Sequence, residues 1–183
     1  PKALIVPHAG FIYSGPVAAS AYDLLRCARG IVRRVVLLGP CHRVPVRGLA
    51  LPEAQSFSTP LGNVPINREA VDRIINFPQV VVSSAVHAQE HALEVQLPFL
   101  QQVLGEFSLV PLAVGAATPG EVAEVIEALW GGEETLILIS SDLSHYHPYD
   151  EACAIDRATV DAILGSQTGL NHEQACGATP IAG

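Results

Sequence analysis

The chain has 183 residues, 49% of them hydrophobic, and a formal net charge of −8 at pH 7. This length suits one domain with a well-buried core and is too short for two ordinary domains. One lysine and nine arginines are present without a basic cluster, so the composition argues against binding to nucleic acid or to an anionic membrane surface.

Short apolar runs alternate with segments of helical spacing along the chain. The runs predict strands over residues 3–6, 35–38, 80–82, 108–114 and 135–140. The spacing predicts helices over residues 16–29, 67–76, 90–104, 119–130 and 149–164. This alternation indicates the α/β class, in a single domain over residues 1–183 with a central, largely parallel or mixed sheet flanked by helices.

Three local features refine these boundaries. Thr118, Pro119 and Glu121 form a helix start, with Thr118 as the N-cap. Pro98 would bend or break a helix over residues 90–104, because it removes a backbone donor. The segment 48–65 contains three prolines and predicts an irregular excursion or a short hairpin.

The first predicted strand runs directly into His8, which precedes a loop containing Gly10 and Gly15. The loop lacks the spacing of a phosphate-binding glycine motif. Ligands of open α/β sheets bind beyond the carboxyl ends of the strands, and imidazole is the commonest metal ligand. We therefore predict that His8 is a metal ligand; the plain alternative is a histidine that bonds a turn carbonyl.

His42 repeats this arrangement after the second predicted strand and is the second predicted metal ligand. Cys41 precedes it and raises the alternative of a cysteine–histidine nucleophile pair. Adjacent side chains of an extended segment point to opposite faces, however. We therefore expect Cys41 to be a small buried residue.

His87, Glu90 and His91 match the pattern H-x-x-E-H, in which two histidines hold zinc and the glutamate serves as base. The pattern needs a helix from residue 87, whereas the apolar stripe of this segment begins only at Leu93. A zinc-dependent hydrolase is therefore kept as an alternative function. The plain interpretation is a solvated first helical turn, with acidic groups at its amino end.

The last predicted strand is followed by a cluster of polar groups that includes Asp142, His145 and His147. An ordinary capped loop would also have such a composition. Two histidines, an acid and three hydroxyl groups after one buried strand nevertheless favour a site. The carboxyl ends of three strands thus bring histidines that are distant in sequence toward one pocket.

The cysteines at positions 27, 41, 153 and 176 are widely spaced, unlike those of a secreted disulfide scaffold. No apolar run approaches the roughly 18 residues of a membrane span, and no signal peptide is evident at residue 1. We therefore expect reduced thiols, no membrane association and a cytoplasmic location.

Seven segments in this order resemble the Memo-like family, whose bacterial and archaeal members are also called AmmeMemoRadiSam system protein B. They are PHAGFIYSGPVAASAY, LLGPCH, FSTPLGNVPI, HAQEHALEVQLPFLQ, LVPLAVG, SSDLSHY and ACGATPIAG. The family normally extends beyond both ends of the matching region. We therefore expect this chain to be the central part of such a protein, truncated at both ends.

The resemblance implies a fold similar to that of class III extradiol dioxygenases, non-haem iron enzymes that use two histidines and a carboxylate. His8 and His42 match the two histidine ligands, His145 resembles the acid–base histidine, and His91 matches a second pocket histidine. The carboxylate ligand has no counterpart that can be placed. Asp142 or His145 is left to complete the set.

These features predict a pocket that binds a divalent metal, iron(II) first and zinc or copper next, on His8 and His42. His145 would act as a proton shuttle, oriented by Asp142 or His91. By analogy, the reaction would be a dioxygenase-like oxidation of a small substrate. The alternative is a non-catalytic protein, without metal, that uses the pocket to bind a small molecule, a peptide or a partner.

Overall fold

The computed structural model describes residues 1–183, and a six-stranded mixed sheet forms its centre. The strand order is β1-β8-β2-β7-β3-β6, and only the β3–β7 pair is antiparallel. The strands are β1 (Ala3–Val6), β2 (Arg34–Pro40), β3 (Leu49–Leu51), β6 (Val80–Val82), β7 (Ser108–Val114) and β8 (Thr135–Ser140). All five predicted strands are present, and the mixed α/β architecture is confirmed.

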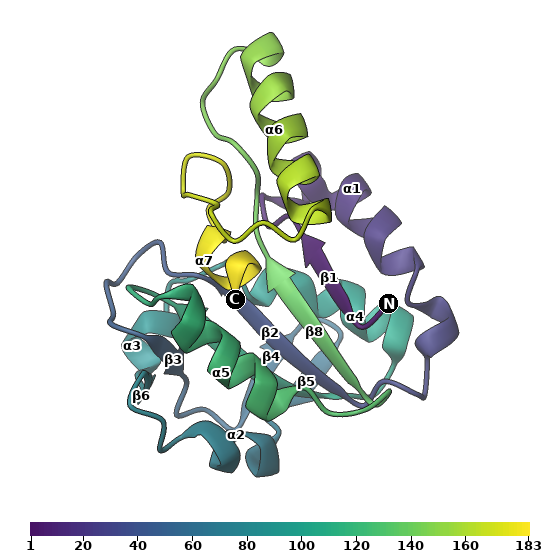
Figure 1. Ribbon diagram of the computed structural model, residues 1–183. Helices are drawn as coiled ribbons and strands as arrows, with labels where there is room; N and C mark the ends of the chain where they lie inside the picture. The colour runs from purple at the N-terminus through teal and green to yellow at the C-terminus, as the bar shows by residue number, and fades with distance from the viewer.

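Helices cover both faces of this sheet. Figure 1 shows α5 over one face, α1 and α4 over the other, and α6 standing away from the body of the domain. The helices are α1 (Phe11–Asp23), α2 (Arg68–Ile74), α3 (Ser84–His87), α4 (Leu97–Leu104), α5 (Pro119–Leu129), α6 (Tyr149–Leu164) and α7 (Ala178–Ala182), with 3₁₀ turns η1 (Arg26–Ala28) and η2 (Glu94–Gln96). None of these helices is both long enough and apolar enough to cross a membrane.

Two helix boundaries differ from the predicted ones. The helix predicted from residue 16 begins at Phe11, so that Pro16 lies inside α1, where it forfeits one backbone hydrogen bond. The helix predicted over 90–104 is shorter because α4 begins at Leu97, which places Pro98 in the first turn, where no donor is needed.

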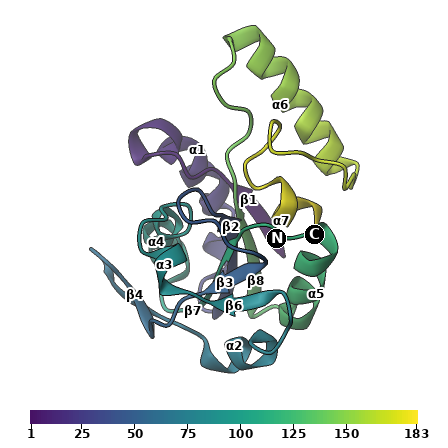
Figure 2. The same cartoon turned by 90° about the vertical axis from the view of Figure 1, so that its left-hand side faces the viewer.

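The other local predictions are confirmed. The side chain of Thr118 accepts from the backbone N–H of Glu121, whose carboxylate accepts from the Thr118 N–H. The 48–65 segment contains a hairpin of β4 (Ser56–Thr59) and β5 (Gly62–Pro65), which projects from the domain in Figure 2.

The central strands are buried on both faces, which explains their unbroken apolar sequences. Every residue of β2 and β8 is buried. Burial of each large aliphatic side chain stabilises the fold by about 1.5–3 kcal/mol. The carboxyl ends of these two strands are therefore anchored in the core.

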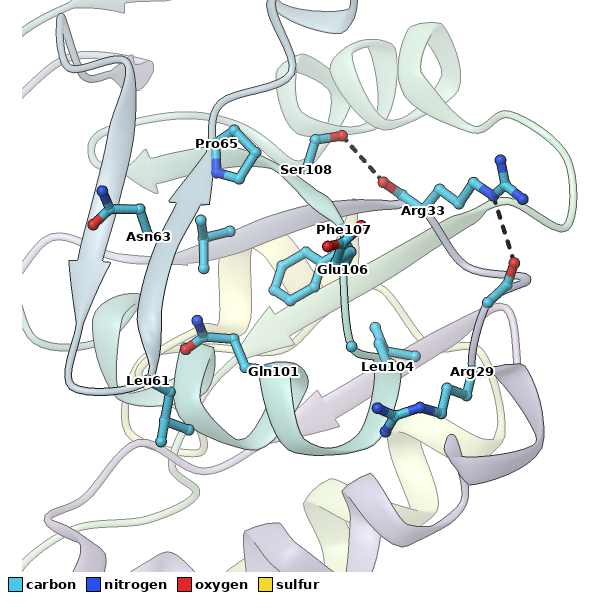
Figure 3. Close-up of a pocket in the computed structure, with 13 residues that line it drawn as sticks. Arg29, Arg33, Leu61, Asn63, Pro65, Gln101, Leu104, Glu106, Phe107 and Ser108 are labelled. Atoms are coloured by element: carbon cyan, nitrogen blue, oxygen red, sulfur yellow. Dashed lines mark hydrogen bonds between the residues drawn. The ribbon is translucent and has the colours of Figure 1, made fainter.

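The amino ends of β2 and β7 border a cavity of about 1100 Å³. Figure 3 shows Arg29 and Arg33 on one side of it, the β4–β5 hairpin on the other, and Gln101 and Leu104 of α4 between them. This cavity is at the opposite end of the sheet from the predicted histidine site.

Candidate metal centre

The three side chains of the candidate centre come from three distant segments. His8 follows β1, His42 follows β2, and Cys176 lies in the turn before α7. One ligating atom from each residue lies within 4.8 Å of the other two. The two imidazole rings meet edge to face, with centroids 5.3 Å apart.

The parallel sheet brings the two histidines together. Strand β8 lies between β1 and β2 and pairs with both in parallel, so the residues that follow β1 and β2 emerge at the same edge. In Figure 1 the segment that carries α7 lies beside the carboxyl end of β8. The third group is therefore supplied by a late part of the chain.

Backbone contacts fix Cys176 at the end of β8. The Asp142 N–H donates to Cys176 Sγ at 3.3 Å, and the Cys176 N–H donates to the Asp142 carbonyl at 3.2 Å. The next residue is Gly177, where a Cβ atom would lie 2.7 Å from Cβ of Ser141. A side chain at position 177 would therefore clash with Ser141 unless the turn moved away from the end of β8.

His8 is almost enclosed, with 7% of its side chain exposed. Its Nδ1 lies 2.9 Å from Ser140 Oγ, and its Nε2 lies 3.3 Å from Cys176 Sγ. The His8 backbone N–H donates to Asp142 Oδ1 at 2.8 Å. One ring nitrogen is therefore bonded to the protein scaffold, and the other faces the thiol.

His42 is held by a buried carboxylate instead. Its Nδ1 lies 3.0 Å from Glu90 Oε1, and its backbone N–H donates to Glu90 Oε2 at 2.6 Å. Hydrogen bonds to Cys176 and to Glu90 raise the pKa of His42 to about 10. Burial opposes ionisation of Glu90, but its hydrogen bonds from His42 and Ala92 outweigh burial and lower its pKa to about 2.

The two nearby cysteines have opposite properties. Burial raises the pKa of Cys176, but its contacts with His42 and His8 outweigh burial and bring this pKa to about 6. Cys176 is thus a thiolate at neutral pH, the form that binds metals. Burial and the Glu90 charge raise the pKa of Cys41 to about 12, and Cys41 packs against the hydrophobic core as a neutral thiol.

Asp142 and His145 lie beside this group rather than in it. Asp142 Oδ2 is 3.8 Å from Nε2 of His8 and 3.8 Å from Nε2 of His145. The side chain of His145 is 41% exposed. The group of ligating atoms that lie within 4.8 Å of one another contains Cys176 and neither Asp142 nor His145. Their proposed catalytic roles stay predictions.

The H-x-x-E-H pattern does not form the helix that a zinc site of this type needs. Helix α3 ends at His87, and the next helical residue is Glu94. His87 Nε2 bonds the Ala50 carbonyl at 2.9 Å, and Glu90 contacts His42. His91 is 66% exposed and pairs with Glu94 at 2.7 Å, outside the group formed by the three ligating atoms. Its assignment as a pocket residue stays a prediction.

Sequence reasoning missed Cys176. The residue follows no predicted strand and lies in a loop 168 positions from His8. The one local signal is the pair Cys176-Gly177 in the segment ACGATPIAG, since a glycine beside a potential ligand permits close approach of the backbone. That signal does not say which strand end the loop approaches.

Known proteins resemble this chain over most of its length. The family model described as Memo-like protein matches residues 1–181. A MEMO1 family protein from Thermotoga neapolitana is 39% identical over 180 residues, covering 94% of this chain and 64% of that protein. The corresponding protein from Aquifex aeolicus is 39% identical over 179 residues, covering 95% and 64%. A relative from Metallosphaera sedula is 37% identical over 167 residues, covering 87% and 58%.

The chain therefore spans about 58–64% of the length of these curated relatives. Among solved structures, the uncharacterized protein JW3007 from Escherichia coli K12 matches with a TM-score of 0.57 at 16% identity, over 92% of this chain and 73% of that one. This match shows a shared fold. With a family match over nearly all of its residues, the chain belongs to the Memo-like protein family.

Proposed function

We propose that the chain binds one transition-metal ion through Nε2 of His8, Nε2 of His42 and the thiolate of Cys176. The observation that supports this most strongly is the convergence of the three ligating atoms within 4.8 Å. Metal–ligand bonds of about 2.0–2.3 Å keep two ligands of one ion no more than about 4.6 Å apart. The 3.3 Å between His8 and Cys176 already lies within that limit, so only small movements are needed.

The surroundings of the two histidines suit metal ligation. A ligating imidazole normally donates its other N–H to a carboxylate, a carbonyl or a similar acceptor, which fixes the ring and raises its basicity. Glu90 supplies such an acceptor to His42, and Ser140 supplies one to His8. The residues present therefore fit a bound metal ion.

The thiolate changes the metal that we favour. The resemblance to dioxygenases favours iron(II), whose sites there combine two histidines with a carboxylate. Here the third group is a sulfur, and soft thiolate ligands select copper(I) and zinc over harder ions. We therefore propose copper or zinc ahead of iron for this site. Iron(II) remains the metal that the resemblance to dioxygenases predicts.

The chemistry depends on which ion is bound. Copper or iron would supply one-electron oxidation and reduction, and zinc would supply Lewis acidity. Asp142 lies between His8 and the half-exposed His145. We propose that His145 carries protons to and from a small substrate at Nε2, while Asp142 holds its ring beside the centre.

Metal analysis of the purified protein tests the site. The metal-free chain would be incubated anaerobically with one equivalent of copper(I), zinc or iron(II), dialysed, and analysed by mass spectrometry for bound metal. We expect one ion per chain, and loss of binding in Cys176→Ser. Cys153→Ser is the matched control, because Cys153 is an exposed thiol on α6. Equal metal content and affinity in wild type and Cys176→Ser would contradict the proposal.

A further inference from the structure

We infer that Ser140 is a positioning residue that keeps a proton on Nδ1 of His8 and so leaves Nε2 as the atom that binds metal. This inference rests on the proposed function. It concerns a group buried beneath the centre, where α1, β8 and the start of α4 meet.

The Ser140 hydroxyl has one proton and three partners. Its oxygen lies 2.5 Å from the Ala92 carbonyl, 2.8 Å from Gln96 Nε2 and 2.9 Å from His8 Nδ1. A carbonyl oxygen only accepts, so the single hydroxyl proton is needed between Ser140 and Ala92. The other two partners must then donate to the hydroxyl oxygen. His8 Nδ1 therefore carries a proton.

The side chain of Gln96 keeps the hydroxyl in this orientation. Its Nε2 donates to Ser140 and, at 3.0 Å, to the Pro7 carbonyl, and its Oε1 accepts from the Tyr22 hydroxyl at 2.6 Å. A reversed amide would place its oxygen against the Pro7 carbonyl, which has no proton to offer. Gln96 and Tyr22 are each 1% exposed, so water does not compete with these bonds.

This network opposes a competing arrangement in the centre itself. The Cys176 sulfur, 3.3 Å from His8 Nε2, is an acceptor for a proton on that nitrogen. A neutral ring with its proton on Nε2 would satisfy the thiolate and would block ligation by that nitrogen. By accepting from Nδ1–H, Ser140 favours the other tautomer, in which the Nε2 lone pair is free.

Nitrogen NMR of the metal-free protein tests this assignment without any metal. Long-range proton–nitrogen spectra of histidine-labelled protein at mildly alkaline pH distinguish protonated from unprotonated ring nitrogens. We expect a protonated Nδ1 for His8 in the wild type. An unprotonated Nδ1 beside a protonated Nε2 would overturn the inference, and this result requires no variant.

The variant Ser140→Ala removes the acceptor. We expect its neutral His8 ring to shift its proton to Nε2, toward Cys176, and its metal affinity to fall by about 10–100-fold, the usual cost of losing a partner of a ligating histidine. The matched control is Thr135→Val, because Thr135 carries a buried, hydrogen-bonded hydroxyl on the same strand at its other end. The control should keep the wild-type His8 spectrum and a metal affinity within about twofold.

The two proposals fail separately. If the wild type binds no metal but His8 carries its proton on Nδ1, the proposed function is wrong and the role of Ser140 in fixing the tautomer stands. If metal binds while Ser140→Ala changes neither the His8 spectrum nor the metal affinity, Ser140 has no positioning role.

Discussion

The polar side chains at the two ends of the central sheet differ in their contacts. At the amino end, the cavity of about 1100 Å³ includes Arg29 and Arg33, but their guanidinium groups donate to nearby carbonyls, Arg29 to Gln102 and Arg33 to Gly30. At the carboxyl end, His8 and His42 each bond the scaffold through Nδ1 and direct Nε2 toward one thiolate. Convergence of ligating atoms, rather than cavity volume, distinguishes the end of the sheet that we propose binds metal.

The largest expected difference between the two ends is the effect of metal on stability. Free metal at 100 times its Kd adds about 2.7 kcal/mol to the free energy of unfolding, which raises the Tm of a chain of this length by about 5–10 °C. We expect this rise in the wild type and in Arg33→Ala, and its loss in His8→Ala and His42→Ala. Differential scanning calorimetry with and without metal measures it. A rise retained by both histidine variants would place the metal elsewhere.

Glu90 provides the next test, because it contacts His42 rather than the metal. Glu90→Gln keeps the shape of the side chain but removes the negative charge that orients and polarises the ring. We expect metal affinity to fall by about 10–100-fold, as measured by competition with a chelator. Glu94→Gln is the control, since Glu94 is exposed and pairs with His91 at the surface. Equal losses in both variants would point to a general effect of charge.

At the amino end, we expect Glu134 to make a smaller contribution to the free energy of unfolding, and this contribution should depend on pH. Hydrogen bonds from Thr135 and from the backbone of Gly132, with the Arg34 charge, lower the pKa of Glu134 to about 2. A carboxylate whose pKa is lowered on folding stabilises the protein above its unfolded pKa, and this contribution is lost as pH falls through the folded value. Wild type should therefore be more stable than Glu134→Gln near pH 7.

This difference should shrink between about pH 4.5 and pH 2, because over that range the carboxyl group takes up a proton in the unfolded chain while the folded protein keeps it ionised until the pH approaches 2. Denaturant unfolding at several pH values measures it. Glu133→Gln, at the exposed neighbouring position, is the control for a general effect of removing one negative charge. A difference that is constant with pH would show that the side chain acts through its shape and not through its charge.

The last test is a pair of substitutions that we expect to leave metal affinity unchanged. The double substitution Arg29→Ala and Arg33→Ala removes both cationic groups from the amino-end cavity. Because this cavity is at the far end of the sheet, metal affinity should stay within about twofold of wild type, a change below the cost of losing a direct partner of a ligand. A larger change in a chelator competition would reveal coupling between the two ends.

The sequence separation of the contacting residues determines which parts of the fold and of the candidate site could be predicted from the sequence. Strands β2 and β8 were predictable because burial on both faces leaves continuous apolar sequences. Strand β3 has three residues and gives no such signal. His8 and His42 were predictable because each directly follows a strand, and parallel strands end at one edge.

The remaining parts of the site depend on contacts between distant segments. Cys176 reaches His8 only through the packing of the final turn against Asp142, which has no local pattern. Glu90 belongs to a sequence motif, but its side chain contacts His42, which is 48 positions away. A motif defined by neighbours in sequence therefore assigned Glu90 a partner different from the one the fold supplies.

The pairing of β1 with β8 has a consequence for the order in which the protein is made. Strand β1 lies at the sheet edge and its one neighbour is β8, so Val6 pairs with Ser140, which is synthesised much later. At about 5–20 residues per second, the first strand waits roughly 7–27 s on the ribosome before its partner exists. Cys176 follows later still. The three ligating groups therefore come together only after Cys176 has been synthesised and has packed against the end of β8.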